Sequence, residues 1–404
     1  MLLVGIDWAE TQHAVCLLDA GGTVRRRLMI PHSAVGLRRL CEAVGALEPR
    51  TDAVLVALER PDGLLVEGLL ASGYTVYALN PRAVERYRER TRIGGAKTDE
   101  ADADLLARIL FTDRAHHRPL QPNTPELEEI RVVARQDERA SRDEQRLLGR
   151  LRQDLLDVFP QALAIFPDLR LLSALAFLAR WPSVEFARAA SIAEFEQFLR
   201  EHHHGWARRT AERIREVLHG EALAAPPHRA RAKSGAIQLA AQQLLLLRQQ
   251  RKAWQQHLAS LLEGPAAHPD GELLLSLPGL DVRLAARVLG EIGDDRLRFP
   301  TPAALQCYAG TAPVTKASGR LRVVIARRAC NRLLRRTLEQ WAFCSIVRSD
   351  WARAFYDQQR HRGKTHQAAL RALAHRWLEI LHHLLSTRQR YDELVHQRNR
   401  RLAA

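Results

Sequence analysis

The stretch that decides the fold is MLLVGIDWAETQHAVCLLDAGGTVRRRLMI, residues 1–30. It contains three strand-like runs, Leu2–Trp8, His13–Leu18 and Thr23–Ile30, with a tight turn at Asp19–Gly22. Short links of this kind join antiparallel neighbours. The chain is therefore predicted to open with three antiparallel strands.

Strands and helices then alternate to about residue 110. Ser33 can cap a helix that runs to Leu47, and the nearly all-apolar Ala53–Leu58 is typical of a buried parallel strand. The pattern continues with a helix at Gly63–Ala71, a strand at Tyr74–Leu79, a helix from Pro81 and a helix from Thr98 to Leu110. The order β-β-β-α-β-α-β-α is that of the ribonuclease H fold. Right-handed crossovers place the fourth strand beside the first.

The middle of the chain is predicted to be helical. Thr124 and Pro125 form a good helix start, and that helix can run to Phe159. A second long helix is expected at Ile237–Leu262, after the looser Ala224–Pro227. Its three-four spacing, with one charged break, indicates a helical pair, a coiled coil or a dimer arm. The seam residues are Ile237, Ala240, Leu244, Leu247, Arg251, Trp254, Leu258 and Leu261.

The C-terminal part is also predicted to be helical. A helix ends at Leu273–Leu277, a tight turn follows at Pro278–Leu280, and Asp281 can cap a helix to Ile292. This is a helix-hairpin-helix pattern, in which the amide of Gly279 could hold a DNA phosphate. Any other pair of helices would give the same pattern. We predict domains at 1–115, 116–265, 266–350 and 351–404, with a basic, loosely ordered tail at 388–401.

Composition indicates a polyanionic partner. The chain has 404 residues, and 61 Lys and Arg against 46 Asp and Glu give a formal charge of +15 and a pI of about 10.4. Nucleic acid is the usual partner of such a protein, and a surface selected for solubility is the alternative. The five cysteines contain no CxxC pair, which argues against zinc ribbons and disulfides: Cys16, Cys41, Cys307, Cys330 and Cys344. With no leader and no membrane span evident, we expect a cytoplasmic protein that does not enter membranes.

Four carboxylates are predicted to converge. Asp7 and Glu59 end the first and fourth strands, and Asp99 and Asp102 share one face of the helix that follows the fifth. Such a cluster needs cations, and oxygen ligands suit Mg²⁺ or Mn²⁺. Each acid alone has a simpler interpretation, as a turn residue or as a helix-start acid. Glu100 and Asp104 are interpreted as surface residues.

Arginines form a second pattern. One stripe along the helix from Thr124 consists of Arg131, Arg135, Arg139, Arg142, Arg146 and Arg150. It suits a nucleic-acid backbone, but interspersed acids make a salt-bridged surface helix an equal alternative. Arg332, Arg335 and Arg336 are predicted to contact DNA. The run His202–His204 resembles a metal tract but is interpreted as a helix-end loop.

Ser318 precedes Gly319 in a polar loop, and a glycine permits close approach of a substrate. Four arginines nearby could hold a phosphate: Arg320, Arg322, Arg327 and Arg328. A serine needs activation to act as a nucleophile, and no histidine is close in sequence. By itself this segment is better explained as a Ser-Gly turn with a basic flank.

Two blocks of residues resemble one known family, the DEDD transposases of the IS110 insertion sequences, which include the Piv invertase. The N-terminal block is Gly5-Ile6-Asp7, Glu59, Asn80-Pro81 and Lys97-Thr98-Asp99-Glu100-Ala101-Asp102-Ala103. The C-terminal block is Leu277-Pro278-Gly279-Leu280, Glu291-Ile292-Gly293-Asp294, Tyr308-Ala309-Gly310-Thr311-Ala312-Pro313, Ser318-Gly319 and Asn331-Arg332-Leu333-Leu334-Arg335. Both blocks have the family's order and spacing.

The resemblance implies a RuvC-like domain in which Asp7, Glu59, Asp99 and Asp102 bind metal. It implies that Ser318 attacks DNA and forms a phosphoserine link. It also implies double-stranded DNA and a bridge RNA as partners, a dimer or tetramer with composite sites, and a nucleoid-associated bacterial protein. The run Arg60-Pro61-Asp62-Gly63-Leu64 departs from the family, where a small residue, glycines and an aromatic often follow the glutamate.

Two other functions fit parts of the sequence. A metal-dependent nuclease of the junction-resolvase kind would use water as its nucleophile and need only the carboxylates. A non-catalytic nucleic-acid-binding protein would need neither the carboxylates nor Ser318. The prediction that accounts for both blocks is RNA-guided DNA recombination through a phosphoserine.

Overall fold

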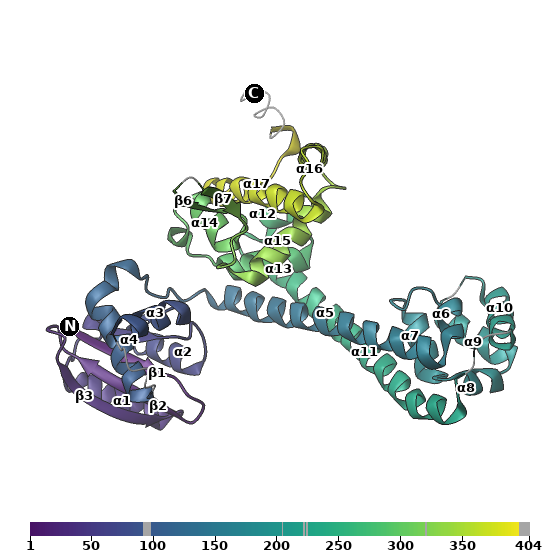
Figure 1. Cartoon of the computed structure of the whole chain (residues 1–404), viewed down its shortest axis with the longest axis horizontal. Helices are drawn as coiled ribbons and strands as arrows, with labels where there is room; N and C mark the ends of the chain where they lie inside the picture. Colours follow the sequence, from purple (N-terminus) through teal and green to yellow (C-terminus); the bar gives the residue numbers. More distant parts are fainter. Residues whose placement is uncertain (92–97, 204, 221–222, 224, 320, 396–404) are drawn as a thin grey trace. The chain divides into compact units, whose positions relative to one another are not determined.

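The computed structural model describes residues 1–91, 98–203, 205–220, 223, 225–319 and 321–395. The chain divides into two compact units, Met1–Pro122 and Asn123–Ala404 (Figure 1). The finer division into four domains stays a prediction.

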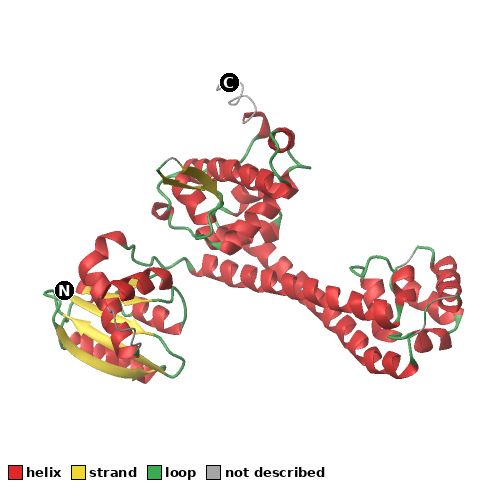
Figure 2. Cartoon of the chain, viewed as in Figure 1, coloured by secondary structure: helices red, strands yellow, loops and turns green. Residues whose placement is uncertain are grey.

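The first unit contains a five-stranded sheet (Figure 2). Its strands are β1 (Leu2–Asp7), β2 (Gln12–Leu18), β3 (Val24–Pro31), β4 (Val54–Leu58) and β5 (Thr75–Ala78). Their order is β3-β2-β1-β4-β5, with β1–β2 and β2–β3 antiparallel and β1–β4 and β4–β5 parallel. The predicted meander and the fourth strand beside the first are confirmed.

Helices cover both faces of this sheet because its strands are apolar on both sides. Val4 and Ile6 of β1 belong to a core shared with α1 (Ala34–Gly45) and α2 (Leu64–Ala71). Leu3 faces the other way, into a core with α3 (Pro81–Thr91) and α4 (Asp99–Asp113). Two short 3-10 segments, η1 (Thr51–Ala53) and η2 (Arg114–His116), complete the described part of the unit.

The second unit is built on two long helices, α5 (Pro125–Val158) and α11 (Pro227–Leu262). Thr124 caps α5, as predicted, by accepting from the Leu127 amide. Ion pairs join Asp137 to Arg251 and Asp154 to Lys233, so the residue numbers run in opposite directions and the helices are antiparallel. One end of the pair packs with α6 (Pro160–Ile165), α7 (Leu172–Arg180), α8 (Val184–Ala189), α9 (Ile192–Glu201) and α10 (Ala207–His219).

The other end of the pair belongs to a second core around Trp341 and Trp377. The elements here are α12 (Gly271–Leu275), α13 (Val282–Ile292), η3 (Arg296–Arg298), α14 (Pro302–Ala309), β6 (Val314–Ser318), β7 (Leu321–Ile325), α15 (Arg332–Ser345), α16 (Asp350–His361) and α17 (His366–Thr387). The predicted helix, Pro-Gly turn and helix are present as α12 and α13.

Several predictions about the second unit need correction. Helix α11 begins at Pro227, ten residues before the predicted start, because a proline fits the first helical position and the run after it has no breaker. The predicted seam faces α5 of the same chain, and its charged break Arg251 bonds to Asp137. The antiparallel pairing within the chain therefore accounts for the heptad pattern.

The C-terminal part is not wholly helical, because β6 and β7 form an antiparallel hairpin. The segment after α17 is not loose as far as Val395. Arg388 bonds to buried Asp270, Arg390 pairs with Glu272, and the Tyr391 hydroxyl accepts from the Trp351 indole at 2.6 Å. Residues 396–401 of the predicted tail lie outside the described residues. His202 ends α9, as expected for a helix-end loop.

Candidate active site and nucleic-acid interface

Asp7 and Glu59 end adjacent parallel strands. Gly5 lies opposite Ala57 in the β1–β4 register, and continuing it by two residues brings Asp7 opposite Glu59. Both residues are half-buried. Because side chains alternate along a strand, Asp7 extends from the same face as Gly5.

Helix α4 crosses that face in backbone contact with β1. A Cβ at Gly5 would overlap the Ala103 carbonyl oxygen and the Ala107 amide nitrogen, so only glycine lets the helix lie this close. The neighbouring Asp102 is drawn inside and is only 4% exposed. Asp99, one turn earlier, is exposed at the start of the helix, where Thr98 caps it by accepting from the Ala101 amide.

A guanidinium compensates the buried carboxylate. Arg88 of α3 donates to Asp102 Oδ1 from Nε at 3.1 Å and lies 3.0 Å from it through Nη2. The Arg88 side chain also pairs with Glu85, and the charge of Glu59 acts on it as well. Arg88 therefore lies where a cation serving Asp102 would bind.

Among the residues that the structure describes, no three His, Cys, Asp or Glu side chains lie close enough to hold a metal ion. Lys97 of the acidic motif belongs to residues 92–97, which fall outside that description. The donor set still suits a hard dication, since carboxylate oxygens at one rim are what Mg²⁺ and Mn²⁺ prefer. Ligation by Asp102 would require the Arg88 side chain to turn away.

Asp104 is not the surface residue that was expected. Its side chain accepts from Arg108 at 2.8 Å and from the buried Cys16 thiol at 3.6 Å. Burial, followed by the charge of Asp104, raises the pKa of Cys16 to about 11. Asp104 thus joins α4 to β2 on the same side of the sheet, whereas Glu100 is exposed as expected.

The residues after the two strand-end acids form a cluster that the sequence did not reveal. The Arg60 guanidinium lies 4.1 Å from the centre of the Trp8 ring, a cation–π contact. Trp8 also contacts His13 and His32, whose ring nitrogens lie 2.9 Å apart. This stack links the loops that follow β1 and β4. The only signal in the sequence was the unusual Arg60-Pro61-Asp62 run.

The tautomer of His13 follows from its partners. The Ala9 amide donates to His13 Nδ1 at 3.2 Å, so this nitrogen accepts and the neutral ring carries its proton on Nε2. That proton is donated to Nδ1 of His32. Burial and the neighbouring His32 lower the pKa of His13. The pair fixes the backbone just beyond Asp7.

Ser318 ends β6 at the tip of the hairpin instead of lying in an irregular loop. It pairs with Leu321, which leaves a two-residue turn of Gly319 and Arg320. Gly319 has a φ of +56°, which a two-residue hairpin favours. Arg320 lies outside the described residues. Ser318 is exposed, and no group in the described part of the chain hydrogen-bonds to its hydroxyl.

A hydrogen-bonded network lies at the base of this hairpin. The Asn331 amide donates to Glu291 Oε2 at 2.6 Å and to the Tyr308 hydroxyl at 2.8 Å. Asn331 also caps α15, and buried Glu291 accepts from Arg135 of α5 at 2.7 Å. The Glu291, Tyr308 and Asn331 motifs, distant in sequence, thus anchor the segment that carries Ser318.

The arginine stripe on α5 is largely salt-bridged. Its paired members contact carboxylates of α5 or α13: Arg131 with Glu128, Arg135 with Glu291, Arg142 with Glu138 and Arg146 with Asp143. Arg139 and Arg150 are exposed, and neither pairs with an acid among the described residues. The surface-helix alternative thus accounts for four of the six.

Part of the stripe adjoins the second predicted set of arginines. Arg336 of α15 lies 3.9 Å from Glu138, the same acid that pairs with Arg142. Arg332 is exposed on the first turn of α15, and Arg335 is half-buried with its guanidinium on the Arg327 carbonyl oxygen. Arg322 and Arg328 are also exposed. The two sets therefore form one basic surface across α5 and α15.

Gly279 has a structural reason to be glycine. Its φ is +81°, and a Cβ would lie 2.6 Å from the Ser345 amide nitrogen. The turn is thus pressed against the end of α15. The proposed phosphate contact of its amide stays a prediction.

The arrangement of an acidic strand rim with a separate serine hairpin defines the class of protein, a DNA transposase. A model of DEDD transposases of the IS110 type, described as Transposase, matches residues 4–160. A second, described as the IS116/IS110/IS902 transposase family, matches residues 271–357. The chain is 36% identical over 404 residues to the mini-circle putative transposase for IS117 of Streptomyces coelicolor, covering 96% of this chain and 95% of that protein.

Two further relatives span similar lengths. The 43.6 kDa insertion element IS110 protein of Streptomyces coelicolor is 29% identical, covering 95% of this chain and 94% of the relative. The 42 kDa insertion element IS900 protein of Mycobacterium paratuberculosis is 26% identical, covering 93% and 94%. The chain belongs to the IS110 family of transposases, whose substrate is DNA. In the described residues no helix is long and apolar enough to cross a membrane.

Proposed function

We propose that this transposase cuts and rejoins DNA through a covalent link to Ser318, with a divalent metal held by Asp7, Glu59, Asp99 and Asp102. The observation that carries the proposal is the strand register: it places Asp7 opposite Glu59 on the face crossed by α4, which carries both aspartates. A structural role alone would not require acids at all four positions.

The chain's own residues have separate roles. The carboxylates would hold Mg²⁺ or Mn²⁺, which when bound would neutralise their charge and polarise a phosphodiester. The Ser318 oxygen would form a bond to phosphorus while the bond to a deoxyribose oxygen breaks, and that oxygen takes up a proton. A DNA hydroxyl would later reverse the exchange and release the serine. One phosphodiester replaces another, so no nucleotide cofactor is consumed.

The basic surface would hold the nucleic acid during these steps. Arg139, Arg332 and Arg322 are exposed, and none of them pairs with an acid among the described residues. Arg135 acts differently, because its bond to Glu291 supports the hairpin from behind. We further propose that a bridge RNA guides the choice of DNA and that two or four copies assemble, since the family resemblance implies both.

Covalent trapping tests the proposal. Protein with co-purified RNA, Mg²⁺ and labelled element-end DNA would be denatured and separated on a gel. We expect a protein–DNA adduct with wild type and with Thr315→Ala, which removes a neighbouring exposed hydroxyl of β6. We expect none with Ser318→Ala or Asp102→Asn. Asp113→Asn, at the far end of α4, is the matched carboxylate control.

The rival nuclease would give a different result. Cleavage without an adduct, unchanged by Ser318→Ala, would mean that water is the nucleophile. DNA binding with no cleavage by any variant or by wild type would leave only a binding protein.

A further inference from the structure

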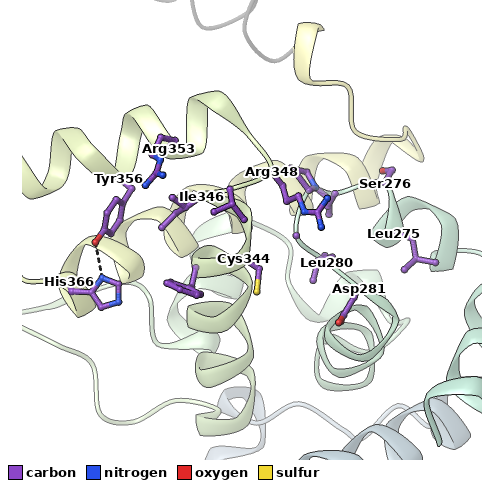
Figure 3. Close-up of a pocket in the computed structure, with 15 residues that line it drawn as sticks. Leu275, Ser276, Leu280, Asp281, Cys344, Ile346, Arg348, Arg353, Tyr356 and His366 are labelled. Carbon is purple, nitrogen blue, oxygen red and sulfur yellow. Dashed lines mark hydrogen bonds between the residues drawn. The ribbon is translucent and has the colours of Figure 1, made fainter. Parts of the chain in front are cut away.

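A pocket of about 740 Å³ lies in the second unit, away from the residues assigned above. The turn after α12 forms one side, and the end of α15 with α16 and the start of α17 forms the other (Figure 3). We call it the Phe343 pocket. Nothing in the proposed chemistry at the carboxylates or at Ser318 uses it.

The side of the pocket formed by the turn is held in place. Gly279 packs against the α15 backbone, and the Trp341 indole donates to the Pro278 carbonyl oxygen at 3.0 Å. Trp341 is itself fully buried in the core. This wall therefore exists before any ligand arrives, which reduces the ordering cost of binding.

An aromatic ring is displayed at the opening. Phe343 is 58% exposed, and its ring meets that of His366 edge-on with centroids 6.2 Å apart. His366 is in turn fixed by a 2.8 Å hydrogen bond to the Tyr356 hydroxyl, drawn as a dashed line in Figure 3. One face of Phe343 is available for stacking, and burying it in water-exposed form serves no core.

The charge at the pocket is cationic. Arg348 and Arg353 line it, both are exposed, and neither makes an ion pair with any described residue. The one carboxylate in the lining, Asp281, is already engaged as the cap of α13, accepting from the Leu284 amide at 2.9 Å. Two unpaired guanidiniums beside an apolar ring favour an anionic, planar ligand over a neutral protein segment.

We propose that the Phe343 pocket binds an unpaired nucleotide of a DNA or RNA strand. The base stacks on Phe343, and Arg348 and Arg353 hold the flanking phosphates. A base inside a duplex cannot reach the ring, so the pocket distinguishes single strands or displaced bases from duplex. This deepens the proposed function, because it names where a strand opened during recombination is held.

Binding can be measured without the chemistry. Full-length protein carrying Ser318→Ala would be titrated, by fluorescence anisotropy, into labelled single-stranded DNA, single-stranded RNA and duplex DNA of one short sequence. We expect Phe343→Ala to weaken single-strand binding about tenfold and duplex binding less than about twofold. Phe343→Leu should behave like Phe343→Ala, since it keeps apolar bulk but loses the ring face.

Matched controls are available in the chain. Phe186 of α8 is 59% exposed, so Phe186→Ala should leave all three affinities unchanged. Arg348→Ala with Arg353→Ala should flatten the salt dependence of single-strand binding by about 1.4, at about 0.7 for each phosphate lost. Arg209→Ala with Arg215→Ala, on α10, is the control of equal charge.

The outcomes separate the alternatives. The tighter of the two single strands identifies the source of the nucleotide. Wild-type affinity in Phe343→Ala, or an equal loss on duplex, would overturn the proposal. So would unchanged nucleic-acid binding together with altered sedimentation of the free protein, because the pocket would then contact another copy. Loss of the covalent adduct elsewhere would not affect this result.

Discussion

The carboxylate rim and the serine hairpin differ in almost every physical respect. At the rim Asp102 is buried, bonded to Arg88 and placed by backbone contact between α4 and β1. Ser318 is exposed at the tip of a two-stranded ribbon, and only the base of that ribbon is anchored. A metal site must be preorganised, because like charges have to be held together. A nucleophile must instead project from the surface to reach a phosphorus atom of DNA.

The strongest test of this difference uses one glycine from each region. Gly5→Ala should destabilise the first unit by about 3 kcal/mol or more, because its Cβ would overlap the α4 backbone. Gly319→Ala should cost about 1 kcal/mol, since its φ is positive but nothing lies within 4 Å of a Cβ there. Thermal unfolding with hydrogen exchange of β1 peptides would measure both.

Gly45→Ala provides the control. Gly45 also has open space but lies in helix α1 with ordinary dihedral angles, so alanine should be neutral or slightly stabilising. If Gly5→Ala proved as mild as Gly45→Ala, α4 would not be fixed against β1 and the carboxylates would not be preorganised.

A smaller effect is expected at Arg88. Removing its guanidinium frees Asp102 and takes away a positive charge that competes with a dication. Arg88→Ala should therefore increase, several-fold, the apparent affinity with which Mn²⁺ stabilises the protein against heat. Arg86→Ala, two residues earlier on α3, is the control. Weaker Mn²⁺ stabilisation in Arg88→Ala would mean that Arg88 orders the site and does not stand in for the metal.

The Trp8–Arg60 stack should have a more limited effect. Arg60→Ala releases the contact between the loops after β1 and β4, so Asp7 and Glu59 are less well held. We expect about tenfold slower adduct formation with a loss of about 1 kcal/mol in stability. Arg60→Lys keeps the charge and should recover part of the rate. Arg39→Ala, exposed on α1, should change neither quantity.

The sequence predicted the rim better than the hairpin, for a physical reason. Buried strands show their apolar pattern directly, and chain connectivity dictates which strand ends meet, so Asp7 and Glu59 could be paired in advance. The run from Val314 to Ile325 is exposed on both faces and lacks such a pattern, although two β-branched segments flank a short glycine turn. The β-branched residues were the missed signal.

Contacts made through tertiary packing were not predictable. Arg60 on Trp8 depends on two loops 52 residues apart meeting at one rim. The stripe on α5 could not be resolved into paired and unpaired arginines, because Arg135 finds its acid on α13. The start of α11 at Pro227 could have been found from the proline itself.

The least of the expected effects is a dependence on pH at the rim. Burial first, and then His32, lower the pKa of His13, while an unfolded histidine titrates near about 6.5. Below that pH the unfolded chain binds more protons than the folded one, so stability falls as pH drops from 6.5 and levels off below the folded pKa. One group contributes at most about 1.4 kcal/mol per pH unit. Hydrogen exchange of β1 and β2 at several pH values would show it.

His13→Gln should reduce this slope, because glutamine still donates toward His32 but does not titrate. The slope should not vanish, since burial also lowers the pKa of His117 in the same unit. Exchange in the core of the second unit around Trp341 should keep its wild-type pH dependence in this variant. An unchanged slope in the first unit would mean that His13 is protonated as easily folded as unfolded. The Ala9–His13–His32 chain would then not be what holds the backbone beyond Asp7, and the rim would owe its order to α4 alone.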